Sequence, residues 1–126
     1  MTKKKPRENR EREERITMDI IVDAYGSEEQ AIGWYYYLEE KLQFPFTAVC
    51  NAKRVISPLR VQDEVDVIGM APEEECEREM FVLIRWEREG LAVPLYQLTP
   101  INAKETQTKE AVGDWHYWVD MGYQFG

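Results

Sequence analysis

The feature that most constrains the fold is a run of short strand-like segments in the middle of the chain, with helical patterns on both sides. Residues 61–69 show the strand pattern most clearly, since Val61, Val65 and Val67 alternate with polar positions such as Glu64. Such alternation is typical of a strand with one buried face. By similar signals, strands are expected at 47–55, 61–69, 79–87, 91–96 and 97–101. Tight turns and a one-turn helical segment would connect them, which predicts an α+β protein built around a small SH3-like β-barrel.

Helical periodicity appears before and after the strands. Two N-terminal helices are expected, at about 8–26 and 27–42, and a C-terminal aromatic helix is expected at 104–121. The residues expected on the buried faces are Ala31, Trp34, Tyr35, Leu38 and Leu42 in the second helix, and Ala111, Trp115, Trp118 and Val119 in the third. Gly33 costs about 1 kcal/mol relative to Ala inside a helix. We therefore expect close packing of another segment at Gly33.

The charge of the chain is unevenly distributed. Residues 1–15 carry seven Lys or Arg against four Glu, a net charge of +3, whereas the rest of the chain has a net charge of −11. Such an acidic body disfavours nucleic-acid binding, because it repels phosphates. The sequence therefore predicts a basic, partly disordered lead-in at 1–15 and a single domain at 16–126.

The sequence also gives expectations about location and redox state. No apolar run approaches the roughly 20 residues that a membrane-spanning helix needs, and the start lacks the apolar region of a signal peptide. Cys50 and Cys76 do not have the spacing of a zinc site. We expect a cytoplasmic protein with reduced thiols and no membrane contact, and a monomer is the favoured state.

Eight carboxylates lie between Asp63 and Glu79, and Arg78 is the only cation among them. Burying such a cluster without a partner would cost several kcal/mol per charge, so the carboxylates either face solvent or bind a cation. The candidate metal ligands are Asp63, Glu64, Asp66, Glu73, Glu74 and Glu75. An open carboxylate cluster suits Ca²⁺ better than Mg²⁺, which demands stricter geometry. Because no EF-hand spacing is present, the residues alone leave a solvated acidic loop as the competing interpretation.

Other candidate sites carry weaker signals. Asp19 and Asp23 are one helical turn apart and precede Glu28 and Glu29, so these four carboxylates form a second possible cation site. Helix capping and the helix dipole explain Glu28 and Glu29 equally well without a metal. His116 is the single histidine, and a hydrolase that pairs it with Cys76 is a remote alternative. No phosphate-binding loop or metal-hydrolase motif is present, so an enzyme is not expected.

Three segments resemble a known family over nearly the whole chain after Arg15. They are IIVDAYGSEEQAIGWYYYLEEKLQFPFTA (20–48), SPLRVQDEVDVIGMAPEEECEREMFVLIRWEREGLAVPLYQL (57–98) and AVGDWHYWVDMGYQF (111–125). They are similar to the small cyanobacterial calcium-binding proteins, and the runs GWYYYLEEKLQFPF and DWHYWV are the most distinctive. The resemblance implies a cytoplasmic protein that binds Ca²⁺ without EF-hands, becomes more compact when loaded, and buffers free Ca²⁺ during cell differentiation.

Two functions thus remain open from the sequence. The first is reversible binding of Ca²⁺ by carboxylates of the 63–79 segment, for buffering or sensing. The alternative is an SH3-like module that binds a protein partner and uses its acidic face for electrostatic steering.

Overall fold

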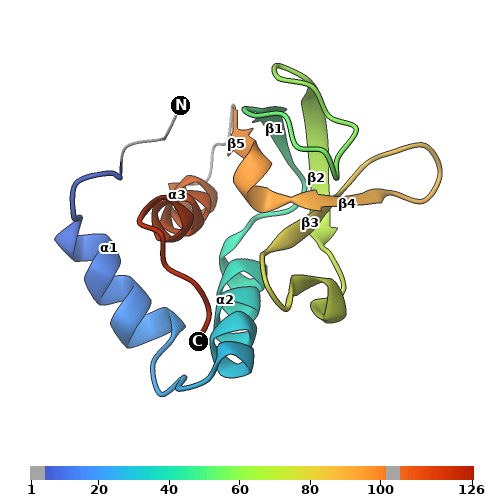
Figure 1. Ribbon diagram of the computed structural model, residues 1–126. Helices are drawn as coiled ribbons and strands as arrows, with labels where there is room; N and C mark the ends of the chain where they lie inside the picture. Colours follow the sequence, from blue (N-terminus) through green and yellow to red (C-terminus); the bar gives the residue numbers. More distant parts are fainter. Residues whose placement is uncertain (1–4, 102–105) are drawn as a thin grey trace.

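The computed structural model describes residues 5–101 and 106–126 of the chain (Figure 1). The helices are α1 (Arg10–Arg15), α2 (Ser27–Lys41) and α3 (Thr106–Asp120), and a π-helical turn, η1 (Ile16–Ile20), continues α1. The strands are β1 (Phe46–Cys50), β2 (Glu64–Met70), β3 (Phe81–Ile84), β4 (Leu91–Pro94) and β5 (Leu98–Pro100), with 3₁₀ turns η2 (Glu73–Cys76) and η3 (Leu95–Gln97). The predicted start of the last helix, Lys104, and the basic residues Lys3 and Lys4 lie outside the described residues.

The five described strands form one antiparallel sheet in the order β4-β3-β2-β1-β5. In its register Val67 lies opposite Phe46 on one side and Ile84 on the other, which places Val67 in the buried centre. The α+β class and the one-turn link between the last two strands, η3, are confirmed. The predicted closed barrel is wrong, because β4 and β5 form the two edges of an open sheet. Short edge strands that are limited by Pro94 and Pro100 end the hydrogen-bonded ladder there.

Helices α2 and α3 lie next to each other on one side of the sheet (Figure 1), and aromatic side chains join them. The ring of Trp34 lies 5.0 Å from Trp115 and 5.7 Å from Trp118, in edge-to-face and tilted arrangements. Such aromatic pairs add stability beyond the area that they bury. The core faces predicted for both helices are confirmed except at Val119, which is half-buried, and Tyr36 is exposed as its helical position requires. Within the described part of the chain, no helix is long and apolar enough to cross a membrane.

The close contact expected at Gly33 is present. A Cβ atom at this position would lie 2.4 Å from the backbone carbonyl oxygen of Ile20, in the π-helical turn η1. The glycine thus allows the backbone of η1 to cross α2 with no side chain between them. The first helical segment is shorter than predicted, because α1 passes into η1 and the chain then turns at Asp23, which has a positive φ of 57°.

Replacing Gly33 by Ala should destabilise the protein by about 1–3 kcal/mol, because overpacking outweighs the better helix propensity of Ala. Urea denaturation followed by circular dichroism measures this change. Gly69→Ala is the matched control, since an added Cβ there has no neighbour within 4 Å. An unchanged denaturation midpoint for Gly33→Ala would contradict the close contact between η1 and α2.

Candidate functional site

The six predicted metal ligands fall into two groups at opposite ends of β2. Asp63, Glu64 and Asp66 lie at the start of this strand, whereas Glu73, Glu74 and Glu75 form the η2 turn after its end. Because a strand rises about 3.3 Å per residue, Glu64 lies roughly 20 Å and Asp66 roughly 13 Å from the end of the seven-residue β2, beyond which η2 begins. Figure 1 shows the same separation, with the β1–β2 loop and the yellow-green η2 turn at opposite ends of β2. The structure does not bring all six carboxylates together.

The group at the start of β2 already has protein partners. Asp63 Oδ2 accepts a hydrogen bond of 2.8 Å from the backbone N–H of Arg60. Asp66 lies 3.6 Å from Arg85 Nε and accepts a hydrogen bond of 3.4 Å from Thr47 Oγ1. These contacts neutralise part of the negative charge and take up carboxylate oxygens that a cation would need.

The three glutamates of η2 are exposed and sit on a rigidly defined turn. Pro72 precedes the turn, and its backbone carbonyl accepts a 2.9 Å hydrogen bond from the N–H of Glu75. The side chain of Cys76 is buried and accepts a hydrogen bond from the backbone N–H of Phe81. Glu73 accepts a hydrogen bond of 3.3 Å from the hydroxyl of Tyr36, and its charge raises the pKa of that phenol. Anchored by Cys76, η2 presents its glutamates to solvent on one side of a groove.

This groove lies between the start of α2, η2 and the end of α3, and its volume is about 1010 Å³. Carboxylates from separate segments line it, namely Glu28, Glu73, Glu74, Glu77 and Glu79. The fold therefore joins Glu28, from the second acidic set, with Glu73 and Glu74 from the first. Glu79 is neutralised by a bidentate ion pair with Arg54, at 2.8 and 3.1 Å. The uncompensated charge of the groove therefore comes from Glu28 and the η2 side.

Among the described residues, no group of three or more His, Cys, Asp or Glu side chains is already placed to hold a metal. Carboxylates that repel one another remain apart until a cation attracts them. Ca²⁺ tolerates irregular ligand geometry and completes its shell with water and carbonyl oxygens. The arrangement is thus suited to a cation that gathers exposed carboxylates upon binding.

The remaining acidic candidates, Asp19, Asp23 and Glu29, are not among the residues that line this groove. Asp19 lines a smaller cavity of about 240 Å³ together with Arg15, Glu40 and Glu110. Asp23 lies in the turn after η1 and accepts a hydrogen bond of 3.4 Å from the Tyr25 hydroxyl. Asp19 and Asp23 thus face different surroundings.

The hydrolase alternative finds no support in the geometry. His116 Nε2 lies 2.8 Å from the backbone carbonyl oxygen of Leu98, and its ring packs on Tyr96. Burial raises the pKa of the Cys76 thiol, which disfavours the thiolate that a nucleophile needs. The contacts of His116 and the burial of Cys76 thus indicate structural roles for both side chains.

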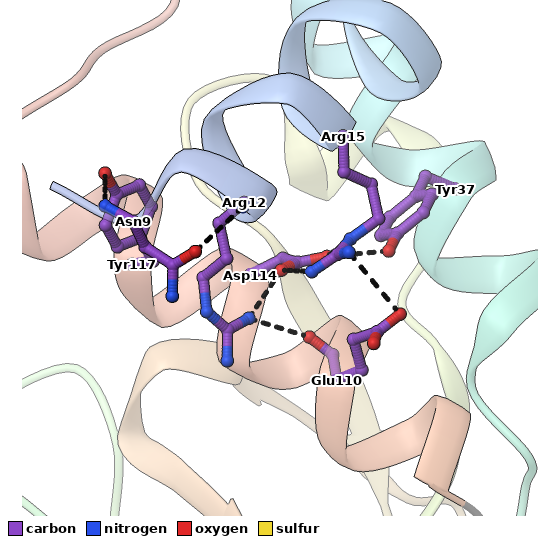
Figure 2. Close-up of polar contacts among 7 residues, drawn as sticks. All are labelled: Asn9, Arg12, Arg15, Tyr37, Glu110, Asp114 and Tyr117. Atoms are coloured by element: carbon purple, nitrogen blue, oxygen red, sulfur yellow. Dashed lines mark hydrogen bonds and ion pairs between the residues drawn. The ribbon is translucent and has the colours of Figure 1, made fainter.

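Sequence reasoning missed a polar cluster around Asp114, shown in Figure 2. Asp114 is fully buried, and its carboxylate accepts two hydrogen bonds of 2.8 Å from Arg15 and a further one from Arg12. The Tyr37 hydroxyl donates a hydrogen bond of 2.7 Å to the same carboxylate. The pKa of Tyr37 is raised, mainly by burial and in addition by this hydrogen bond. The position of Asp114 among the aromatic residues of α3 was the available signal in the sequence. A buried carboxylate at such a position requires cationic partners.

The lead-in segment is therefore attached to the domain. Arg12 and Arg15, expected to be solvated, hold α1 against α3 through Asp114. Glu13 makes a second attachment, because its carboxylate accepts a hydrogen bond from the Tyr117 hydroxyl and another, of 2.9 Å, from the Tyr123 hydroxyl. We call the contacts of Arg12, Glu13 and Arg15 with α3 and the tail the α1 clasp.

Alkaline pH should weaken the α1 clasp. The hydrogen bond to Glu13, followed by partial burial, raises the pKa of Tyr123 to about 12, compared with about 10 for a free phenol. A group with a raised pKa in the folded state stabilises the fold fully below its unfolded pKa. We therefore expect stability to decrease as the pH rises from about 10 through about 12. Melting temperatures and phenolate absorbance across this range measure the effect, and Glu13→Gln should bring the Tyr123 titration closer to its ordinary value.

The fold and its exposed carboxylates define a small acidic α+β protein of the non-EF-hand type, and comparisons with known proteins specify its class. A family model described as calcium binding, Calci_bind_CcbP, matches residues 14–119. The chain belongs to the CcbP family of calcium-binding proteins, and its function is to bind Ca²⁺.

Two solved structures are similar to this chain over nearly its whole length. The crystal structure of Anabaena CcbP is 36% identical and covers 98% of this chain and 100% of its own, with a TM-score of 0.85. A calcium-binding protein in its calcium-binding form is 37% identical and covers 93% of this chain and 95% of its own, with a TM-score of 0.81. Comparison with curated proteins gave no match. The family resemblance expected from the sequence is confirmed, and so is Ca²⁺ as the ligand.

Proposed function

We propose that this protein is a Ca²⁺ buffer of the cyanobacterial cytoplasm, and that its principal Ca²⁺ site lies at the acidic groove beside η2. The observation that carries this proposal is that Glu28, Glu73 and Glu74, from separate parts of the chain, line one groove. Glu75 follows them on the same exposed turn and can add a further carboxylate. The similarity to Anabaena CcbP supports the cyanobacterial setting.

The carboxylates at the start of β2 form the second, weaker candidate. Asp63 and Asp66 already accept hydrogen bonds from Arg60 and Thr47, and Asp66 faces Arg85. Ca²⁺ binding there has to compete with these contacts, and Glu64 alone supplies too few oxygens for the six to eight that Ca²⁺ takes. We therefore assign the higher affinity to the groove.

The kind of ligands involved supports buffering rather than sensing. The glutamates of η2 are solvent-exposed and are carried by a turn that Cys76 anchors to the core. A cation bound there can draw side chains together without displacing a helix or a strand. Compaction on Ca²⁺ binding is then a local effect of reduced carboxylate repulsion.

Two triple variants that each remove three negative charges test the location of the site. Glu73→Gln/Glu74→Gln/Glu75→Gln should weaken the tightest Ca²⁺ binding step by about tenfold or more, which corresponds to about 1.4 kcal/mol or more. Asp63→Asn/Glu64→Gln/Asp66→Asn should have the smaller effect. Calorimetric titration measures both affinities. An unchanged affinity in the first variant, together with a lowered affinity in the second, would contradict the assignment to the groove and favour the carboxylates at the start of β2.

A further inference from the structure

The acidic groove has a second property, an apolar floor. The apolar and aromatic side chains that line it are Ala31, Ile32, Tyr35, Trp115, Trp118, Val119 and Phe125. Ile32 is 41% exposed at this surface, whereas Trp115 and Trp118 are 2% and 6% exposed and pack against Phe125 of the C-terminal tail. The indole Nε1 of Trp115 is buried and has no hydrogen-bond partner among the described residues. We propose that the groove is a docking site for a cationic amphipathic helix of a partner protein, and that Ca²⁺ displaces this helix.

The charge of the groove favours a cationic occupant. Glu28, Glu73, Glu74 and Glu77 line it with Arg78 as the opposing cation, since Glu79 is already paired with Arg54. The whole chain carries a net charge of −8. An acidic segment or a nucleic acid would therefore be repelled, whereas a basic segment is steered towards the groove.

The lining of the groove favours a helix as the occupant, because apolar side chains such as Ile32 lie beside carboxylates such as Glu28 and Glu74. Apolar side chains at helical spacing enter such a groove, while basic residues at the sides of the helix meet the acidic rim. The occupant is thus a helix with one aliphatic face and flanking Lys or Arg.

Ca²⁺ and the helix compete because they need the same side chains. Glu73 and Glu74 line the groove and are also among the ligands in the proposed calcium site. A bound Ca²⁺ adds two positive charges at the rim and takes up these carboxylate oxygens. This competition rests on the proposed function, whereas docking of the helix in the absence of Ca²⁺ does not.

A synthetic Leu/Lys amphipathic helical peptide without Trp tests the docking. Its binding to the full chain in the presence of a chelator is measured by calorimetry and by the fluorescence of the protein's own tryptophans. The comparison peptides are a scrambled Leu/Lys sequence and a Leu/Glu helix of the same pattern. We expect the Leu/Lys helix to bind at least about tenfold more tightly than either comparison peptide. Equal binding of the helical and scrambled cationic peptides would overturn the proposal, because it would indicate charge attraction alone.

Variants at the groove place the peptide. Ile32→Ser at the floor and Glu28→Gln/Glu74→Gln at the rim should each weaken peptide binding by about tenfold. Glu87→Gln/Glu89→Gln, on the exposed β3–β4 connection, removes the same charge away from the groove and should leave binding unchanged. Equal weakening by both double variants would overturn the location. Sedimentation of the protein without peptide covers a further outcome, since a dimer whose formation Ile32→Ser abolishes would make a second copy the occupant and overturn the proposal.

Peptide binding measured in the presence of Ca²⁺ distinguishes the docking proposal from the proposed calcium function. Ca²⁺ at a concentration that calorimetry shows to be saturating should weaken peptide binding by about tenfold or more, and an equal concentration of Mg²⁺ should weaken it less. If Ca²⁺ binds but the peptide remains bound, the competition is wrong and the proposed calcium function stands. If the peptide docks but Ca²⁺ does not bind, the proposed calcium function fails and the docking site stands.

Discussion

Replacing Arg12 and Arg15 together by Met should lower the free energy of unfolding by about 3–5 kcal/mol, the cost of leaving a buried ionic group without its partners. In the native protein both guanidinium groups contact the carboxylate of Asp114, which has no solvent exposure. The double variant leaves Tyr37 as the remaining side-chain donor to this charge among the described residues. Methionine keeps much of the apolar length of each side chain, so the loss reports on the charge interaction.

Urea denaturation followed by circular dichroism measures this loss. Arg10→Met is the matched control, because Arg10 is an exposed residue of the same helix. Tyr37→Phe should have an intermediate effect of about 1–3 kcal/mol, since it removes one donor and leaves the two cations. If the double variant were as stable as Arg10→Met, the contacts of Arg12 and Arg15 with Asp114 would contribute nothing to the stability of the fold.

Saturating Ca²⁺ should stabilise the folded protein strongly. A ligand that binds the folded state with a free concentration of about 100 times its Kd raises the free energy of unfolding by about 2.7 kcal/mol. At the proposed groove site, the cation would also relieve the repulsion between exposed carboxylates such as Glu73 and Glu74. Thermal melting across a Ca²⁺ series measures the effect, and a chelator should reverse it completely.

Two controls distinguish site binding from a general ionic effect. Mg²⁺ at equal concentration should stabilise less, because it resists dehydration and requires near-octahedral geometry. NaCl at equal ionic strength should also stabilise less, because it only screens exposed charges. A melting temperature that rises equally with Ca²⁺, Mg²⁺ and matched NaCl would mean that charge screening, with no calcium site, accounts for the stabilisation.

Periodicity alone predicted much of the fold. The buried faces of the second and third helices depend on local spacing and a single apolar core, so Trp34, Trp115 and Trp118 were placed correctly. Gly33 was recognised because glycine is unfavourable inside a helix unless close packing requires it. The backbone of Ile20 makes this close contact with Gly33.

The closure of the sheet depended on information that local patterns lack. Strand signals give length and alternation, but whether β4 and β5 pair with each other is decided by twist and by the connections. In the structure Leu98 of β5 pairs with Cys50 of β1, and β4 pairs with β3, which leaves two open edges.

The candidate site was predictable in composition but not in grouping. The six proposed ligands are close in sequence, but an extended β2 places Asp66 and Glu73 at opposite ends of a strand. Conversely, Glu28 is distant in sequence from Glu73 and lines the same groove. The sequence also could not show that Arg12 and Arg15 reach Asp114, because this contact spans about 100 residues of chain.

The most direct test of the account is isothermal titration of the wild-type protein with Ca²⁺ and, separately, with Mg²⁺ at the same ionic strength. The account predicts saturable Ca²⁺ binding that the Glu73→Gln/Glu74→Gln/Glu75→Gln variant weakens, together with weaker Mg²⁺ binding. The absence of saturable heat and of thermal stabilisation at millimolar Ca²⁺ would contradict it.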